Sequence, residues 1–330
     1  MKILIIGANG FIGSNIVNSF VKNAQYEIHI LIRKTSNIER LKENIDKVKI
    51  FYGDVRDKDS LIEPVKSADV IIHSAAVLRC IEDKTYYDVN YLGTKNLVET
   101  VVKHNHNLKK FIFLSSQAAA GPCEFLSFKS SDDEKCTPVS HYGKSKLLAE
   151  KELKKYSNKI NIIILRPAAV YGPYDKDMFI YFKLAEKGMI PTFSKEFYIQ
   201  FTYVYDLVSV IEKIVSLDNI YNKTFFIAED KCYKIDEIKE TFEKVVNKKI
   251  KIVYIPYLFG YVAAYLNEKF YKIIYKKPSE FNRDKLAELS KSYWLCESSE
   301  IKKYLPDFSY TPLCVGLKET YLWYRNNNWL

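Results

Sequence analysis

Three glycines, Gly7, Gly10 and Gly13, stand at three-residue intervals near the start of the chain. They follow the apolar run Ile3–Ile6 and lead into a helical pattern. Glycines in a strand-to-helix turn let the backbone approach a pyrophosphate, which rests on the N–H groups and the positive end of the helix. The pattern predicts a dinucleotide site, although the spacing differs from Gly-x-Gly-x-x-Gly and a turn that binds nothing is the alternative. The expected cofactor contacts in this turn are Gly7, Asn9, Gly10, Phe11, Ile12 and Gly13.

Short apolar runs alternate with helical patterns through the first half of the chain. This βαβ alternation predicts an α/β protein with a doubly wound parallel sheet of the Rossmann type and a smaller, mainly helical C-terminal lobe. We expect a dinucleotide-binding domain over 1–170, to which 206–230 returns, and a substrate-binding lobe from 171–205 and 231–330. The expected strands are Ile3–Ile6, Glu27–Ile32, Lys49–Tyr52, Val70–His73, Lys110–Leu114 and Ile160–Leu165.

The 330 residues carry a net charge of +10, but the basic residues are spread along the chain. This favours a solvated, lysine-rich surface over a nucleic-acid interface. Six scattered cysteines and five histidines lack metal-ligand spacing, which predicts free thiols and no metal site. No run of 18 apolar residues occurs, and the first strand leaves no room for a signal peptide. We therefore expect a cytoplasmic protein with a small-molecule substrate and no nucleic-acid partner.

The segment Ile255–Ile274 combines many aromatic residues with lysines. One interpretation is an amphipathic helix on a membrane surface. The preferred interpretation is a helix of the C-terminal lobe whose aromatic side chains fill a core or line a pocket. Peripheral membrane contact is therefore the less favoured alternative.

The second predicted strand runs into Arg33-Lys34-Thr35-Ser36, which contains no carboxylate. An acidic residue at this point binds the ribose 2′-hydroxyl of NAD, whereas a basic one accommodates the 2′-phosphate of NADP. Arg33, with Lys34 and Ser36 beside it, favours NADP, and NAD is the alternative. Further cofactor contacts are expected after the third and fourth strands, at Asp54, Val55, Ala75, Ala76 and Val77.

Tyr142 and Lys146 lie four residues apart, on one face of a predicted helix. A nearby positive charge lowers the pKa of a phenol from about 10, so that it can exchange a proton with a carbinol or carbonyl near neutral pH. The same spacing recurs at Tyr91 and Tyr265, each with a lysine four residues on. Only Tyr142 follows the loop after the fifth strand and opens the next helix, which makes it the catalytic candidate.

The fifth predicted strand ends in Ser115 and Ser116. We assign Ser116 to the substrate oxygen that Tyr142 protonates, while Ser115 is the fallback and is expected to face the cofactor. A turn residue that bonds its own backbone is the alternative for either serine. Substrate contacts are also expected at Gln117, Ala169 and Arg79, although a surface position is equally open for Arg79.

Taken together, these motifs resemble the extended short-chain dehydrogenase/reductase superfamily, which includes the NAD-dependent epimerase/dehydratase proteins. The resemblance covers nearly the whole chain and implies a catalytic triad of Ser116, Tyr142 and Lys146. It implies that Lys146 also holds the nicotinamide ribose and that Asn90 supports the site. The motifs that carry it are Gly7–Gly13, Asp54, Ala75–Ala76, Asn90 with Thr94, Ser115–Ser116, Tyr142 with Lys146, and Leu165–Pro173.

The resemblance has further implications for the cofactor and for assembly. It places Pro167 and Val170 near the nicotinamide. It also implies a homodimer formed through the helices of Asp83–His104 and Tyr142–Tyr156.

Departures from the family pattern narrow the activity. Gln117-Ala118 replaces the Asp-Glu pair of sugar-nucleotide 4,6-dehydratases, which argues against water elimination. Ala169 and Ile199 stand where many sugar-nucleotide epimerases have an asparagine and an arginine for the substrate phosphates. The stretches Gln200–Val204 and Tyr321–Arg325 look more like the 3β-hydroxysteroid dehydrogenase and dihydroflavonol reductase branches.

The preferred function is therefore an NADP-preferring oxidoreductase that transfers a hydride between nicotinamide and a secondary alcohol or ketone. One alternative is a nucleotide-sugar epimerase with transient hydride transfer. The other is a non-catalytic NADP-binding sensor or scaffold.

Overall fold

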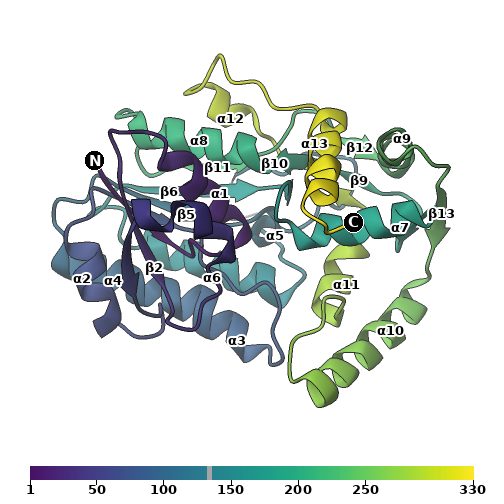
Figure 1. Ribbon diagram of the computed structural model, residues 1–330, viewed down its shortest axis with the longest axis horizontal. Coiled ribbons are helices and arrows are strands. Elements are labelled where there is room, and N and C mark those ends of the chain that lie inside the picture. The colour runs from purple at the N-terminus through teal and green to yellow at the C-terminus, as the bar shows by residue number, and fades with distance from the viewer. Residues whose placement is uncertain (132–135) are drawn as a thin grey trace.

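The computed structural model describes residues 1–131 and 136–330. Its central element is a seven-stranded parallel sheet in the order β11-β6-β5-β4-β1-β2-β3 (Figure 1). The sheet and its flanking helices confirm the expected Rossmann-type architecture. The strands are β1 Lys2–Ile6, β2 Glu27–Ile32, β3 Lys49–Tyr52, β4 Val70–His73, β5 Lys110–Leu114, β6 Ile162–Pro167 and β11 Thr224–Ile227.

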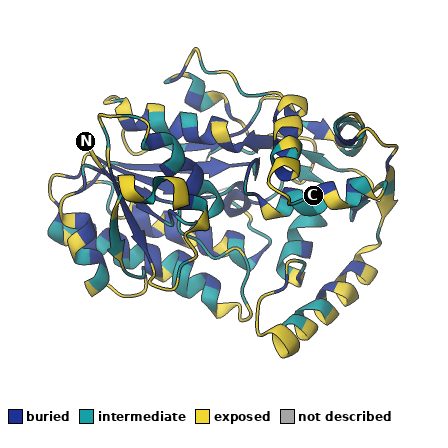
Figure 2. Cartoon of the chain, in the orientation of Figure 1, coloured by how far each residue is buried: buried dark blue, intermediate teal, exposed yellow. Residues whose placement is uncertain are grey.

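Helices cover both faces of this sheet, which explains why its strands are apolar throughout (Figure 2). Successive side chains of β1 enter opposite cores. Ile3 and Ile5 pack with α1 and α8, whereas Leu4 and Ile6 pack with α2, α4 and α6. These helices are α1 Phe11–Phe20, α2 Asp59–Lys66, α4 Gly93–His104, α6 His141–Lys154 and α8 Val204–Ser216.

The strand order reverses between β1 and β4. Open α/β sheets bind their ligands beyond the carboxyl ends of the strands at such a reversal. Three short elements surround this edge of the sheet: α3 Lys84–Tyr86, a π-helical turn η2 Tyr87–Leu92 that continues into α4, and α5 Gln117–Ala120.

The C-terminal lobe is mainly helical, as expected, and adds small sheets that pair β7 with β10, β8 with β13, and β9 with β12 and β14. Its helices are α7 Lys176–Glu186, α9 Ile235–Val246, α10 Tyr257–Phe270 with the π turn η4 Tyr271–Tyr275, α11 Arg283–Leu289, α12 Ser299–Lys302 and α13 Leu313–Asn326. Its strands are β7 Ala169–Tyr171, β8 Met189–Thr192, β9 Tyr198–Ile199, β10 Phe201–Tyr203, β12 Tyr233–Lys234, β13 Lys251–Tyr254 and β14 Tyr293–Trp294.

Helix α10 projects along the margin of the lobe and is largely exposed (Figures 1 and 2). The expectation that its aromatic side chains fill a core is wrong. Only Gly260 and Ala264 are buried in this helix, whereas Leu258 and Phe259 are 69% and 68% exposed. Small residues form the packed face, since a Cβ on Gly260 would come within 2.7 Å of the Phe193 ring. Among the residues that the structure describes, none of the helices combines the length and apolar character needed to span a bilayer.

Candidate active site

The glycine turn links β1 to α1 through very close backbone contacts. Gly7 has φ +87°, and a Cβ at this position would lie 2.5 Å from the Ala75 backbone nitrogen. A Cβ on Gly13 would lie 2.1 Å from the Gly7 carbonyl oxygen. Gly10 caps α1 without a side-chain hydrogen bond, which leaves the first N–H groups of the helix available. This cradle fits a dinucleotide pyrophosphate.

The turn after β2 carries positive charge and no carboxylate. Arg33 and Lys34 are exposed. The turn is closed by its own backbone: the Ser36 N–H donates to the Arg33 carbonyl at 2.9 Å, and the Arg33 N–H donates to the Ser36 hydroxyl at 3.2 Å. The Ser36 hydroxyl therefore serves this turn, while the Arg33 guanidinium extends toward solvent.

Asp54, in the turn after β3, is already paired. Its carboxylate accepts hydrogen bonds from Arg56 Nε at 3.0 Å and from Nη2 at 2.8 Å. This pairing holds the pKa of Asp54 below its usual range. Val55 beside it is buried, and a Cβ on Gly93 would reach within 2.5 Å of its side chain. An adenine contact by Asp54 would have to share the carboxylate with Arg56.

The buried Asn90 connects the loop after β4 to α6. Its Oδ1 accepts from the Val77 N–H at 2.7 Å, and its Nδ2 donates to the Val77 carbonyl at 3.1 Å. The same Nδ2 donates to the Ser145 hydroxyl at 3.0 Å. Asn90 thus fixes the loop that contains Ala75 and Ala76 against the helix that contains Tyr142.

Ser116 and Tyr142 lie near each other beyond the carboxyl end of β5. Ser116 caps α5, accepting a hydrogen bond from the Ala118 N–H at 3.1 Å, and its side chain lies close enough to the Tyr142 phenol to influence the pKa of that group. Burial raises the pKa of this phenol well above its usual range, the Glu288 charge adds to the rise, and the Ser116 side chain opposes it. The phenol is therefore neutral in this arrangement.

Lys146 lies one helical turn after Tyr142 and is buried. Its Nζ donates to the Leu114 carbonyl at 2.5 Å and lies 4.0 Å from the centre of the Phe113 ring. Burial lowers the pKa of Lys146 to about 7, against the opposing effect of the Glu150 charge. The lysine is thus directed at the end of β5, and the contacts of the described residues do not join it to the Tyr142 phenol.

Ser115 points to a different partner from Ser116. Its hydroxyl donates to the Glu150 carboxylate, which also binds Arg166. Glu150 and Arg166 are both buried. The structure therefore separates the two serines, and only Ser116 lies near Tyr142.

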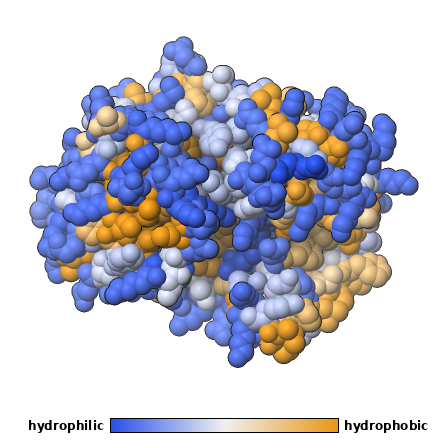
Figure 3. All heavy atoms as spheres, in the orientation of Figure 1, coloured by the Kyte–Doolittle hydropathy of each residue, from blue (hydrophilic) through white to orange (hydrophobic). Residues whose placement is uncertain are grey.

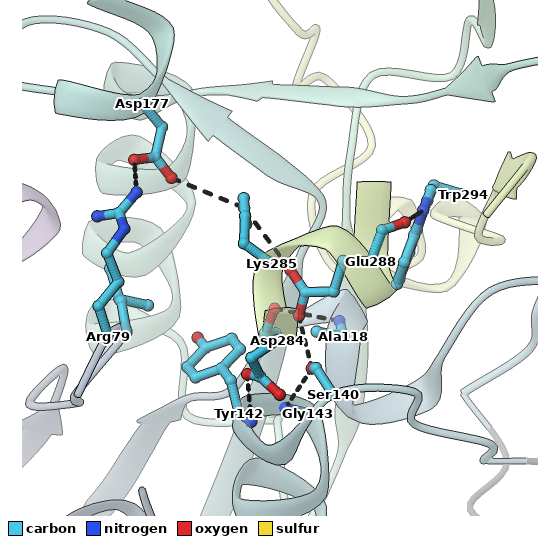
Figure 4. Close-up of polar contacts among 12 residues, drawn as sticks. Arg79, Ala118, Ser140, Tyr142, Gly143, Asp177, Asp284, Lys285, Glu288 and Trp294 are labelled. Carbon is cyan, nitrogen blue, oxygen red and sulfur yellow. Dashed lines mark hydrogen bonds and ion pairs between the residues drawn. The ribbon is translucent and has the colours of Figure 1, made fainter. Parts of the chain in front are cut away.

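A group of charged residues from the C-terminal lobe surrounds Tyr142 (Figure 4). The Asp284 carboxylate accepts from the backbone N–H groups of His141 at 2.5 Å and Tyr142 at 3.2 Å, at the start of α6. The Ser140 hydroxyl donates to Glu288 at 2.6 Å. Helix α11 is thereby fixed against the helix that contains the phenol.

Arg79 joins the two parts of the molecule instead of lying free on the surface. Its guanidinium contacts the Asp177 carboxylate at the start of α7, and its Nε donates to the Glu280 carbonyl at 3.1 Å. Lys285 Nζ lies 3.7 Å from Asp177 and 3.6 Å from Glu288. Although burial disfavours the charged form, Lys285 and Arg79 hold the pKa of Asp177 below its usual range.

Sequence reasoning missed Asp177, Asp284, Lys285 and Glu288. These residues lie on lobe helices far along the chain from Arg79 and Tyr142, and no motif spacing marks them. The sequence carries no signal that singles them out, since four of the seven residues of α11 are charged, as on an ordinary solvated helix.

A cavity of about 510 Å³ adjoins this group. It lies between the start of α6, the loop after β4 and the C-terminal part of α10. Its lining is strongly charged and carries both signs, with the basic Lys144, Lys269, Lys272, Lys277 and Arg283 and the acidic Glu82, Asp83, Glu268 and Asp284. The residues important here are His141, Lys144, Tyr261, Lys269, Lys272 and Arg283.

The remaining expected site residues lie on α5, β6 and β7. Gln117 is buried, and its Nε2 has no hydrogen-bond partner in the described part of the chain, which leaves a donor for a ligand. Pro167 ends β6, and Ala169 and Val170 are half-buried in β7. Ile199 lies in the two-residue strand β9.

The chain is similar to several curated proteins. It is 29% identical over 197 residues to UDP-glucose 4-epimerase of Vibrio cholerae, a match that covers 57% of this chain and 58% of the relative. It is 27% identical over 288 residues to N-acetyl-alpha-D-glucosaminyl-diphospho-ditrans,octacis-undecaprenol 4-epimerase of Escherichia coli O157:H7, covering 84% of this chain and 82% of the relative. It is 24% identical to a sterol-4-alpha-carboxylate 3-dehydrogenase of Candida albicans over 84% of each chain.

Solved structures share the fold over nearly the whole chain. UDP-glucose 4-epimerase of Thermotoga maritima gives a TM-score of 0.77 at 22% identity, covering 99% of this chain and 100% of the other. UDP-glucuronic acid 4-epimerase of Bacillus cereus, solved in complex with NAD, gives 0.77 at 23% identity and covers 99% of each chain.

A family model for the NAD dependent epimerase/dehydratase family matches residues 3–226. The match includes the glycine turn, Ser116, Tyr142 and Lys146. Together with the fold, it shows that the chain is an NAD(P)-dependent enzyme of the short-chain dehydrogenase/reductase or epimerase type and belongs to the NAD dependent epimerase/dehydratase family.

Proposed function

We propose that the protein is a 4-epimerase of a diphosphate-linked sugar. The observation that carries this proposal is the glycine cradle after β1, with Ser116 and Tyr142 placed near each other beyond the end of β5. The choice of epimerase is supported by the relatives, one of which is similar over 84% of this chain and therefore includes the lobe that would bind the substrate.

In this proposal the ionised phenol of Tyr142 removes the proton from the sugar hydroxyl as the C–H bond at the same carbon breaks. A nicotinamide dinucleotide held by the glycine turn would supply the hydride acceptor, and its reduced form the hydride donor, for this inversion. Tyr142 then gives the proton back, Ser116 holds the oxygen by a hydrogen bond, and Lys146 binds the nicotinamide ribose and favours the ionised phenol. Gln117, with its unpartnered Nε2, would contact the sugar.

The diphosphate has basic partners in spite of Ala169 and Ile199. Lys144, Lys269 and Lys272 line the cavity at the start of α6. Lysine side chains pair with phosphate oxygens as point charges. These residues come from elements other than those of the family pattern, so the absence of the usual donors does not leave a diphosphate unpaired.

A net oxidoreductase acting on a secondary alcohol or ketone is the second candidate. It is supported by the small and apolar side chains of Ala169 and Ile199 and by the similarity to the sterol dehydrogenase. We further propose that NADP binds more tightly than NAD, because Arg33 and Lys34 extend from the end of β2 without a carboxylate. We also propose a homodimer through α4 and α6, where Leu92 at the end of η2 and Leu148 of α6 are exposed.

The test is turnover of the purified full-length chain with UDP-linked and polyprenyl-diphosphate-linked sugars. We expect the configuration of one sugar carbon to invert, which NMR would monitor. The near-ultraviolet absorbance of reduced nicotinamide should show no net change. A change in absorbance that matches product formation would contradict the epimerase proposal and support the oxidoreductase instead. Dinucleotide binding without any turnover across both substrate classes would support the sensor instead.

A further inference from the structure

An apolar strip runs along the exposed side of α10 and η4. Four of its side chains follow a four-residue spacing, which aligns them along one side of a helix. Each member of the strip is between 48% and 69% exposed. The strip consists of Leu258, Val262, Leu266, Phe270, Ile273 and Ile274. Figure 3 shows apolar surface gathered at this margin of the molecule.

The packing of α10 fixes the strip toward solvent. On the opposite side Gly260 and Ala264 are buried. Asn267 Nδ2 donates to the Phe281 carbonyl at 2.7 Å, and Glu268 pairs with Arg283 at 2.9 Å. Rotating the helix to bury the strip would break these contacts. Soluble proteins rarely expose a contiguous apolar surface of this kind unless something binds there.

The charge pattern along the segment identifies the binding partner. From Ile252 to Asn267 the chain has no acidic or basic residue. Four lysines then follow within nine residues, and in the part of the chain that the structure describes none of them forms an ion pair: Lys269, Lys272, Lys276 and Lys277. An apolar surface bordered by unpaired lysines is complementary to acyl chains bordered by anionic phosphates. A second copy would instead bring like charges together, in a chain with a net charge of +10.

We propose that α10 and η4 dock on the surface of an anionic lipid bilayer. The apolar strip enters the boundary between headgroups and acyl chains, and Lys272, Lys276 and Lys277 lie at the level of the lipid phosphates. The segment lies on the membrane and does not cross it.

Docking in this orientation brings the membrane close to the candidate active site. Tyr261, Lys269 and Lys272 of the docking segment also line the cavity at the start of α6, together with Asp284, which binds the Tyr142 backbone. A diphosphate-linked sugar anchored in the bilayer could therefore enter the cavity from the lipid surface. This consequence rests on the proposed function, whereas the docking itself does not.

The first test measures co-sedimentation of the full-length protein with phosphatidylcholine vesicles that contain or lack phosphatidylglycerol. We expect binding to the anionic vesicles. The triple variant Leu258→Gln, Val262→Gln and Leu266→Gln should bind at least about tenfold more weakly, because three apolar side chains are lost from the interface. The matched control replaces three exposed apolar residues elsewhere, Tyr221→Gln, Val315→Gln and Leu322→Gln. Unchanged melting temperatures would show that both variants fold.

The second test addresses the charge. Replacing Lys272, Lys276 and Lys277 by Ala should weaken binding to anionic vesicles by about fivefold for each lysine and reduce its salt dependence. Replacing the exposed Lys159, Lys187 and Lys318 by Ala is the control.

Three results would overturn the proposal. They are failure of the parent protein to bind anionic vesicles, equal loss of binding in the control variants, and a concentration-dependent dimer that the apolar-strip variant converts to a monomer. The last result would assign the strip to a protein interface. Because no assay here uses turnover, a failed epimerase test leaves the docking result intact.

Discussion

Arg166 Nη2 lies 2.5 Å from Glu150 Oε2, and both side chains are buried. Removing one member leaves an uncompensated buried charge, so we expect Glu150→Leu to lower the free energy of unfolding by about 3–5 kcal/mol. Adding Arg166→Met to that variant should restore part of the loss. Urea unfolding of both variants measures the effect, and a single substitution without effect would contradict this role of the pair.

Tyr142→Phe removes the hydroxyl that would exchange the substrate proton. We expect turnover to fall by at least about 10²-fold, while the dissociation constant of the dinucleotide changes little. Tyr91→Phe is the matched control, since Tyr91 also has a lysine four residues on but lies in η2. Steady-state kinetics and cofactor titration would check both, and comparable activity in the two variants would refute the catalytic role.

The glycine cradle can be tested with two variants, Gly13→Ala and Gly10→Ala, whose added Cβ atoms crowd the Gly7 carbonyl oxygen to different degrees. A Cβ on Gly13 would lie 2.1 Å from the Gly7 carbonyl oxygen, whereas one on Gly10 would lie 3.2 Å from it. We therefore expect Gly13→Ala to lower the melting temperature and to abolish dinucleotide binding, and Gly10→Ala to have the smaller effect. Similar losses in the two variants would mean that crowding against Gly7 does not decide binding.

Arg33→Ala tests the proposed preference for NADP. Hydrogen bonds to charged groups contribute about 1.5–3 kcal/mol, so the dissociation constant of NADP should rise about tenfold or more. That of NAD should stay nearly constant, because NAD lacks the 2′-phosphate. Arg325→Ala, another exposed arginine, provides the control. NAD binding more tightly than NADP to the parent protein would refute the preference.

Lys146 should make stability depend on pH. Burial lowers its pKa to about 7, below the value of about 10.5 expected in the unfolded chain. At pH values between these two pKa values the unfolded chain binds more protons than the folded chain, so the free energy of unfolding rises with pH. Below about pH 7 the lysine is charged in both states, and the full cost of burying that charge lowers the stability of the folded chain. Lys146→Met should remove this rise, whereas Lys144→Met on the exposed side of α6 should keep it. Urea unfolding at several pH values distinguishes the two outcomes.

The sheet could be predicted closely because its strands are buried on both faces. Apolar runs such as Glu27–Ile32 and Val70–His73 begin and end where β2 and β4 do. The strand expected from Ile160 begins instead at Ile162. An apolar run alone does not indicate which of its residues enter the hydrogen-bonded ladder.

The glycine turn and Ser116 could be proposed as site residues because they follow predicted strands, and Tyr142 because it opens the helix after the loop beyond the fifth strand. The charged residues around the phenol could not be found, since Arg79 and Asp177 lie on separate elements and pair only after folding. Helix α10 was misjudged for a related reason. Apolar side chains such as Leu258 look alike in a sequence whether they pack in a core or lie on the surface.

The position of β11 limits how this protein can be divided. The strand comes from beyond residue 171, yet it forms one edge of the large sheet, next to β6. A fragment ending near residue 170 would lack it, and the ladder groups of the apolar strand Ile162–Pro167 would become unpaired. Such a bare margin is a template for strand addition between molecules. The nucleotide-binding half would therefore aggregate when expressed alone.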